Sequence, residues 1–110
     1  MLRESPYVKI VVAVPLDAAD GVRDALTRAG AGRQGNYEAC SGSYRQTGRF
    51  RPREGAKPAI GSVGKLEEVE EEVIEAICHR DLVARAVEEV KKAHPYEEPA
   101  IDIIPRLEIS

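Results

Sequence analysis

The sequence predicts a single α+β domain in which two helices cover one face of an antiparallel sheet. The chain has 110 residues and 43% hydrophobic residues, which suits one core of ordinary size. Two segments with helical periodicity each follow a segment typical of a strand, and a further strand-like segment lies near the C-terminus. Glycine and proline gather between these two units, where two middle strands fit around a loop.

The first strand and helix are predicted within residues 7–30. Tyr7–Pro15 is rich in β-branched residues and nearly all apolar, as expected of a central strand. Pro15 ends it because proline has no N–H to donate. Asp17 occupies the position of a helix N-cap, apolar residues follow at helical spacing, and Gly30 is expected to end the helix.

The middle of the chain is predicted to be mostly loop. Glycines recur from residue 32 to residue 64, and no long apolar period is visible. Short strands are expected around Tyr37–Cys40 and Ser62–Val63, with a long basic loop at about residues 41–60 between them. Loops of this length in compact domains are usually functional or disordered.

The stretch Lys65–His79 fits either a helix or a strand. Its periodicity alone slightly favours a helix, although residues 73–78 also alternate tolerably. Asp81 provides a fresh N-cap signal before the clear helix of residues 82–93, which favours a strand followed by a helix. Ala100–Pro105 alternates and is predicted as the last strand. This order of elements is the split βαβ, or ferredoxin-like, pattern.

This arrangement leaves one face of the sheet uncovered, and the composition makes the core thin. The chain has no tryptophan, one phenylalanine (Phe50) and four tyrosines. Aromatic side chains bury the largest areas, so their scarcity limits what a single subunit can bury. Both features predict a homo-oligomer.

Several classes of protein are excluded or disfavoured. Two cysteines, Cys40 and Cys78, cannot form a disulfide-rich scaffold and lack close metal-site spacing, so buried, reduced thiols in a cytoplasmic protein are expected. No apolar run is long enough to span a membrane. The net charge of −3 and the few aromatic residues among the arginines disfavour nucleic-acid binding.

The charge is unevenly distributed along the chain. Residues 33–57 carry six basic and two acidic residues, whereas residues 65–98 carry five basic and eleven acidic ones. Arginine binds phosphate and carboxylate groups through planar, paired donors. Arg49, Arg51 and Arg53 are therefore candidate ligands for a small anion, a nucleotide or an acidic protein partner. A solvated, charged loop is the other interpretation.

The densest polar cluster is His94-Pro95-Tyr96-Glu97-Glu98-Pro99, between the second helix and the last strand. His94 with Glu97 or Glu98 could bind a divalent metal or act as an acid–base pair. A single histidine is a weak metal signal, because zinc sites usually need three or four protein ligands. A proline-rigidified structural turn is therefore favoured, and no nucleophile or oxyanion donor supports an enzyme.

These motifs together resemble one known family. The resemblance is carried, in chain order, by Gly35-Asn36-Tyr37, Cys40-Ser41, Gly48, Phe50, Pro52, Gly55, Pro58, Ile60-Gly61, Gly64, Leu66-Glu67 and residues 94–100. The set is similar to the YqfO-type domain, which occurs alone or inserted in NIF-three-like proteins, and the His-Pro-Tyr-Glu turn resembles that of CutA.

The resemblance implies a fold like that of CutA and the PII signal proteins, which are commonly trimeric. It implies a non-catalytic binding or regulatory module whose ligand contacts involve Arg49, Arg51, Arg53, Tyr96, Glu97 and Glu98. The alternative that it implies is a divalent-metal protein of CutA type that uses His94 and Glu97. The metal-dependent enzyme domain of the larger relatives has no counterpart in these residues, and the sequence names no cofactor.

Overall fold

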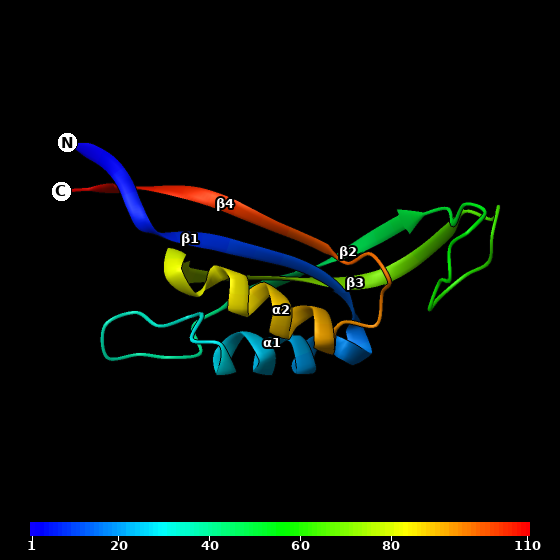
Figure 1. Cartoon of the computed structure of the whole chain (residues 1–110), viewed down its shortest axis with the longest axis horizontal. Coiled ribbons are helices and arrows are strands. Elements are labelled where there is room, and N and C mark those ends of the chain that lie inside the picture. The colour runs from blue at the N-terminus through cyan, green and yellow to red at the C-terminus, as the bar shows by residue number, and fades with distance from the viewer.

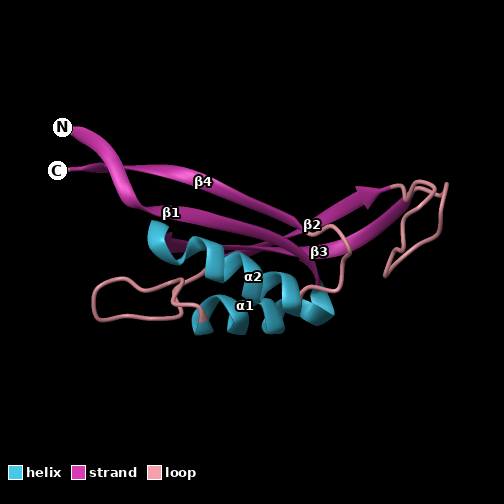
Figure 2. Cartoon of the chain, in the orientation of Figure 1, coloured by secondary structure: helices cyan, strands magenta, loops and turns pink.

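The computed structural model describes residues 1–110 and has two helices packed on one face of a four-stranded sheet (Figures 1 and 2). In chain order the elements are β1 (Leu2–Pro15), α1 (Ala19–Arg28), β2 (Gly42–Phe50), β3 (Glu67–His79), α2 (Val83–Ala93) and β4 (Ala100–Ile109). The strands lie in the order β2-β3-β1-β4, and every neighbouring pair is antiparallel. The predicted fold class and the strand within residues 65–79 are confirmed.

The core lies between the sheet and the two helices. Alternate residues of β1, from Val8 to Val14, are buried, which is the periodicity of a strand with one covered face. The buried cluster contains Ile10, Val12 and Val14 of β1, Ile74, Ala76 and Cys78 of β3, and Val22, Ala25, Leu26, Ala86 and Val90 of the helices. No aromatic residue belongs to it, so the core is built from small aliphatic side chains, as predicted.

The other face of the sheet carries no helix (Figure 1). Cross-strand pairing places Lys9, Val11 and Ala13 of β1 on this open face, beside Ile77, Glu75 and Val73 of β3, in the same order. Lys9 and Glu75 form an ion pair of 3.5 Å there. The open face is therefore a mixed apolar and charged surface.

The middle of the chain corrects the sequence prediction. Residues 42–50 of the predicted loop form β2, whereas the short strands predicted at Tyr37–Cys40 and Ser62–Val63 are absent. The side chains of this strand contact glutamates of β3, since Arg49 pairs with Glu68 at 3.2 Å and the Thr47 hydroxyl donates to Glu70 at 2.8 Å. The loop that remains between β2 and β3 spans residues 51–66.

The helix starts also differ from the prediction. Asp17 and Asp81 both lie inside single-turn 3-10 helices, Leu16–Ala18 and Arg80–Leu82, so neither caps the α-helix that follows. α1 and α2 begin after Ala18 and Leu82 without side-chain caps. Gly30 follows the end of α1 with φ +91°, a left-handed conformation that favours glycine, as predicted.

The first and last residues of the chain pair as a two-stranded extension of the sheet, here called the terminal ribbon. Leu2–Glu4 of β1 pairs with Leu107–Ile109 of β4, and a register shift separates this ribbon from the main ladder. The Ser110 N–H donates to the Met1 carbonyl at 3.0 Å, so the two chain ends lie side by side (Figure 1). Both flanking strands are thus longer than predicted.

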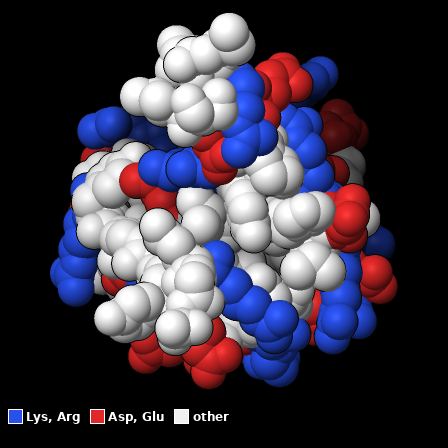
Figure 3. Space-filling model, turned by 90° about the vertical axis from the view of Figure 1, so that its left-hand side faces the viewer, with Lys and Arg blue, Asp and Glu red and all other residues white.

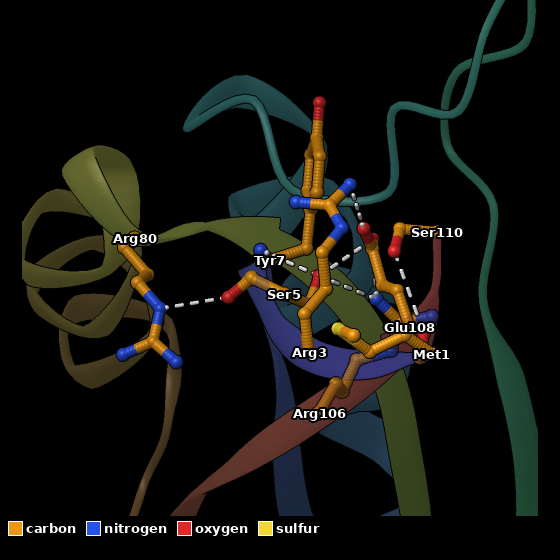
Figure 4. Close-up of polar contacts among 8 residues, drawn as sticks. All are labelled: Met1, Arg3, Ser5, Tyr7, Arg80, Arg106, Glu108 and Ser110. Carbon is orange, nitrogen blue, oxygen red and sulfur yellow. Dashed lines mark hydrogen bonds and ion pairs between the residues drawn. The ribbon is translucent and has the colours of Figure 1, made fainter.

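A buried serine anchors this ribbon to the sheet (Figure 4). Ser5 is 1% exposed, and its hydroxyl donates to Glu108 at 2.7 Å while it accepts from the Tyr7 N–H and from Arg106. Glu108 also pairs with Arg3 at 3.0 Å and with Arg106 at 3.8 Å. Ser5, Glu108, Arg3 and Arg106 are called the Ser5 cluster below. Basic and acidic side chains are intermixed over this end of the molecule (Figure 3).

Candidate ligand pocket

A cavity of about 530 Å³ lies against the open face of the sheet, walled by the loop of residues 51–66 and the turn of residues 94–99. The register places Ala13, Gln46 and Glu71 on this open face, with Ala100 of β4 beside Ala13. The cavity is lined by all six predicted ligand-binding residues: Arg49, Arg51, Arg53, Tyr96, Glu97 and Glu98. Residues that are dispersed along the sequence therefore meet at one site.

A chain of hydrogen bonds connects the turn to the sheet behind the cavity. His94 is 6% exposed, its Nε2 lies 2.7 Å from the Ala13 carbonyl oxygen, and its Nδ1 accepts from the Tyr96 N–H at 3.1 Å. The Tyr96 hydroxyl then donates to Glu71 Oε2 at 2.8 Å, and Gln46 donates to Glu71 Oε1 at 3.0 Å. These bonds fix the turn relative to β1, β2 and β3.

The environment of Tyr96 keeps its hydroxyl protonated. Burial raises the pKa of Tyr96 well above its usual range, and the hydrogen bond to the Glu71 carboxylate raises this pKa further. The ring also packs against His94 and Phe50, with ring centroids 4.9 Å and 5.7 Å away. Tyr96 is therefore a fixed donor and part of the apolar wall.

The three arginines differ in their partners. Arg49 on β2 pairs with Glu68 at 3.2 Å, whereas Arg51 and Arg53 are exposed and form no ion pair. Glu97 accepts a hydrogen bond from the Lys57 N–H at 3.1 Å, which joins the loop to the turn. Two guanidinium groups at the cavity are therefore available to an anion.

His94 and Glu97, the predicted metal pair, are not assembled into a metal centre. Both ring nitrogens of His94 are engaged with backbone groups, and His94 does not line the cavity. No group of three or more His, Cys, Asp or Glu side chains in the structure has the geometry to hold a metal ion. Within one subunit, His94 and Glu97 therefore do not provide the three or four ligands of a usual zinc site.

A second cavity, of about 410 Å³, lies beside α1 and is lined partly by Arg23 and Cys40. Arg23 is committed to Asp20 and Glu72, whose hydrogen bonds raise the pKa of its guanidinium. Both cysteines are free thiols. Because the charge of Arg23 is already balanced by these two carboxylates, the second cavity is the weaker candidate for a ligand site.

The sequence prediction did not include Glu71, Gln46 and Gly48 in the pocket. Glu71 belongs to a run of glutamates that resembles a solvated surface, and Gln46 and Gly48 were assigned to a loop. The side chains of a strand alternate between its two faces, so Glu71, two residues before Val73, lies on the same open face as Val73. This alternation in β3 could have predicted the position of Glu71.

The chain was compared with known proteins and structures. No protein-family model matches it. It is 50% identical over 102 residues to a GTP cyclohydrolase 1 type 2 homolog from Halalkalibacterium halodurans and 45% identical over 95 residues to one from Mycobacterium bovis. These alignments cover 93% and 86% of this chain but only 27% and 25% of the relatives. The chain thus spans about a quarter of the length of the curated relatives it matches.

Among solved structures, a Bacillus cereus protein related to NIF3 matches with a TM-score of 0.80 and 42% identity, over 96% of this chain and 26% of that one. A periplasmic divalent cation tolerance protein CutA from Archaeoglobus fulgidus matches with a TM-score of 0.65 and 21% identity, over 91% of this chain and 83% of that one. The second likeness shows the fold alone.

The fold and the comparisons define a CutA/PII-like α+β domain. More particularly, the chain is related to the domain inserted in the GTP cyclohydrolase 1 type 2 homologs and NIF3-related proteins. None of its helices is both long and apolar enough to cross a membrane.

Proposed function

We propose that this domain is a non-catalytic, homotrimeric binding or regulatory module that holds a small anionic ligand in the pocket on its open sheet face. The observation that carries the proposal is the convergence of Arg51 and Arg53, which have no ion-pair partners, with Tyr96 at one cavity. Its volume falls in the range typical of small-molecule sites. A phosphate or carboxylate group would supply the missing partner of the two guanidinium groups.

Calorimetric titration with inorganic pyrophosphate and with a nucleoside monophosphate tests the anion site. Each charge-assisted hydrogen bond lost should weaken binding by about tenfold, so Arg51→Ala/Arg53→Ala should weaken it by that factor or more. Arg85→Ala is the matched control, because Arg85 is exposed on α2 and does not line the pocket. Equal binding by the wild type and the double variant would remove the arginines from the site.

The proposed trimer is supported by the apolar side chains that a single subunit leaves exposed on β4. Ile103, Ile104, Leu107 and Ile109 are all more than a third exposed. Such residues on an uncovered edge strand are a common subunit contact. Light scattering should give about three times the 12.0 kDa mass of the chain, and a monomeric mass would refute the trimer.

A further inference from the structure

Glu71 is a buried carboxylate on the wall of the pocket. It is 5% exposed, and β2 makes room for it at Gly48, where a Cβ atom would overlap the Glu71 carboxylate. Both residues line the cavity. The glycine therefore leaves room for a buried carboxylate in a cavity wall that also carries apolar and basic side chains.

Glu71 forms no ion pair with a basic side chain of the protein. Its two hydrogen bonds come from neutral donors, the Tyr96 hydroxyl and the Gln46 amide, and no Lys, Arg or His lies within 4.0 Å of its oxygens. Each oxygen retains a free lone pair. A buried charge without a counter-ion is costly, so this group is suited to a positively charged or N–H-bearing ligand.

We propose that the pocket selects an amino-bearing anion, with Glu71 as the residue that determines specificity. This inference rests on the proposed function, in which Arg51 and Arg53 hold the acidic end of the ligand. Glu71 accepts from an ammonium or other N–H donor elsewhere on the same ligand. Phe50 and Ile60, which also line the cavity, contact the carbon frame between these two groups.

The test compares ω-aminoalkylphosphonates with alkylphosphonates of the same chain length, over a series of lengths, by calorimetry. A charged hydrogen bond to Glu71 should make the wild type bind the best amino probe about tenfold tighter than its alkyl counterpart. Glu71→Gln should bring this ratio close to one. Glu70→Gln is the matched control and should keep the wild-type ratio, because Glu70 is the exposed glutamate next to Glu71 on β3 and does not line the pocket.

The possible outcomes separate the two proposals. If both probes bind the wild type equally and Arg51→Ala/Arg53→Ala weakens both, the anion site stands and the role of Glu71 is refuted. If neither probe binds, the proposed function fails and this inference fails with it.

A measurement on the wild type guards against a Glu71→Gln variant that does not fold. A nuclear Overhauser contact between the aminomethylene group of the probe and the Tyr96 ring would place the ammonium beside Glu71. A contact between the aminomethylene group and Glu98, without one to the Tyr96 ring, would overturn the proposal.

Discussion

The two ends of the sheet both contain a buried polar group, but only one of these groups is fully compensated. At the terminal ribbon, the Ser5 hydroxyl uses all its hydrogen-bonding capacity and Glu108 has two arginine partners. At the pocket, Glu71 accepts hydrogen bonds from two neutral donors and forms no ion pair. Arg51 and Arg53, which line the same pocket, also form no ion pair.

Burial of a polar group therefore does not by itself mark a binding site. A closed network such as the Ser5 cluster stabilises the fold and offers nothing to a ligand. A network with spare acceptors and unpaired charges at a cavity has capacity left for one. Substitutions at the two ends should therefore separate stability from binding.

Substitution of Gly48 should change both stability and binding. Gly48→Ala places a Cβ where the Glu71 carboxylate lies, so it should displace that carboxylate and break its bonds to Tyr96 and Gln46. The Glu71 carboxylate is the end of a flexible side chain and can turn aside, so the cost comes from the two lost hydrogen bonds. We expect a loss of about 2 kcal/mol in the free energy of unfolding, measured by denaturant titration, together with loss of phosphonate binding.

Gly42→Ala is the matched control for this substitution. Gly42 lies on the same strand, and an added Cβ there meets nothing within 4 Å. Its effect should stay within about 0.5 kcal/mol. Equal stabilities of the two variants would show that Gly48 is not needed to accommodate Glu71.

A smaller overall effect, a loss of stability alone, is expected at the Ser5 cluster of the terminal ribbon. Ser5→Ala removes the partner of the Tyr7 N–H and one partner each of Glu108 and Arg106, so the unfolding free energy should fall by about 2 kcal/mol. Phosphonate affinity, measured by calorimetry, should not change. A parallel loss of affinity would mean that the two ends are coupled and the comparison between them is invalid.

A smaller effect concerns the alkaline stability of the pocket end. Because folding raises the pKa of Tyr96 above its ordinary value near 10, the neutral phenol stabilises the fold fully below about pH 10 and less as the pH rises further. The measurement is the tyrosinate absorbance of the wild type and of Tyr96→Phe as the pH is raised. The difference between the two curves reports Tyr96 alone and should show no ionisation step near pH 10. A step at that pH would show that the ring is not held as the structure indicates.

The smallest effect is chemical and leaves stability unchanged. Cys78 is 1% exposed, and burial raises the pKa of its thiol, whereas Cys40 is half-buried. An aromatic disulfide reagent should therefore modify one thiol rapidly in the native protein, and Cys40→Ser should abolish that fast phase. Two fast thiols would indicate that the core opens at Cys78.

The strand–helix units were predictable because apolar periodicity records which face of an element is covered. Tyr7–Pro15 and residues 82–93 follow these patterns closely, and β1 and α2 form there. The β2 strand was not predictable in the same way. It has no regular apolar alternation, and its side chains contact glutamates of β3 that lie 19 and 23 residues away in the sequence.

The pocket was partly predictable for a related reason. Arg51 and Arg53 could be named from their chemistry and Tyr96 from the family resemblance, before their positions were known. Glu71 could not, because its importance comes from burial without a counter-ion, which only the packing of Gly48 and the turn around it creates.

The pairing of the two chain ends has a consequence for how this domain can be joined to other proteins. Met1 and Ser110 lie side by side at one end of a molecule whose long axis measures 50 Å, while the pocket-forming loop of residues 51–66 lies toward the other end (Figure 1). A short linker could close the ends into a circle, so a circular permutant reopened near Gly35 should retain the pocket. A neighbouring domain attached through both ends would likewise leave the ligand entrance clear.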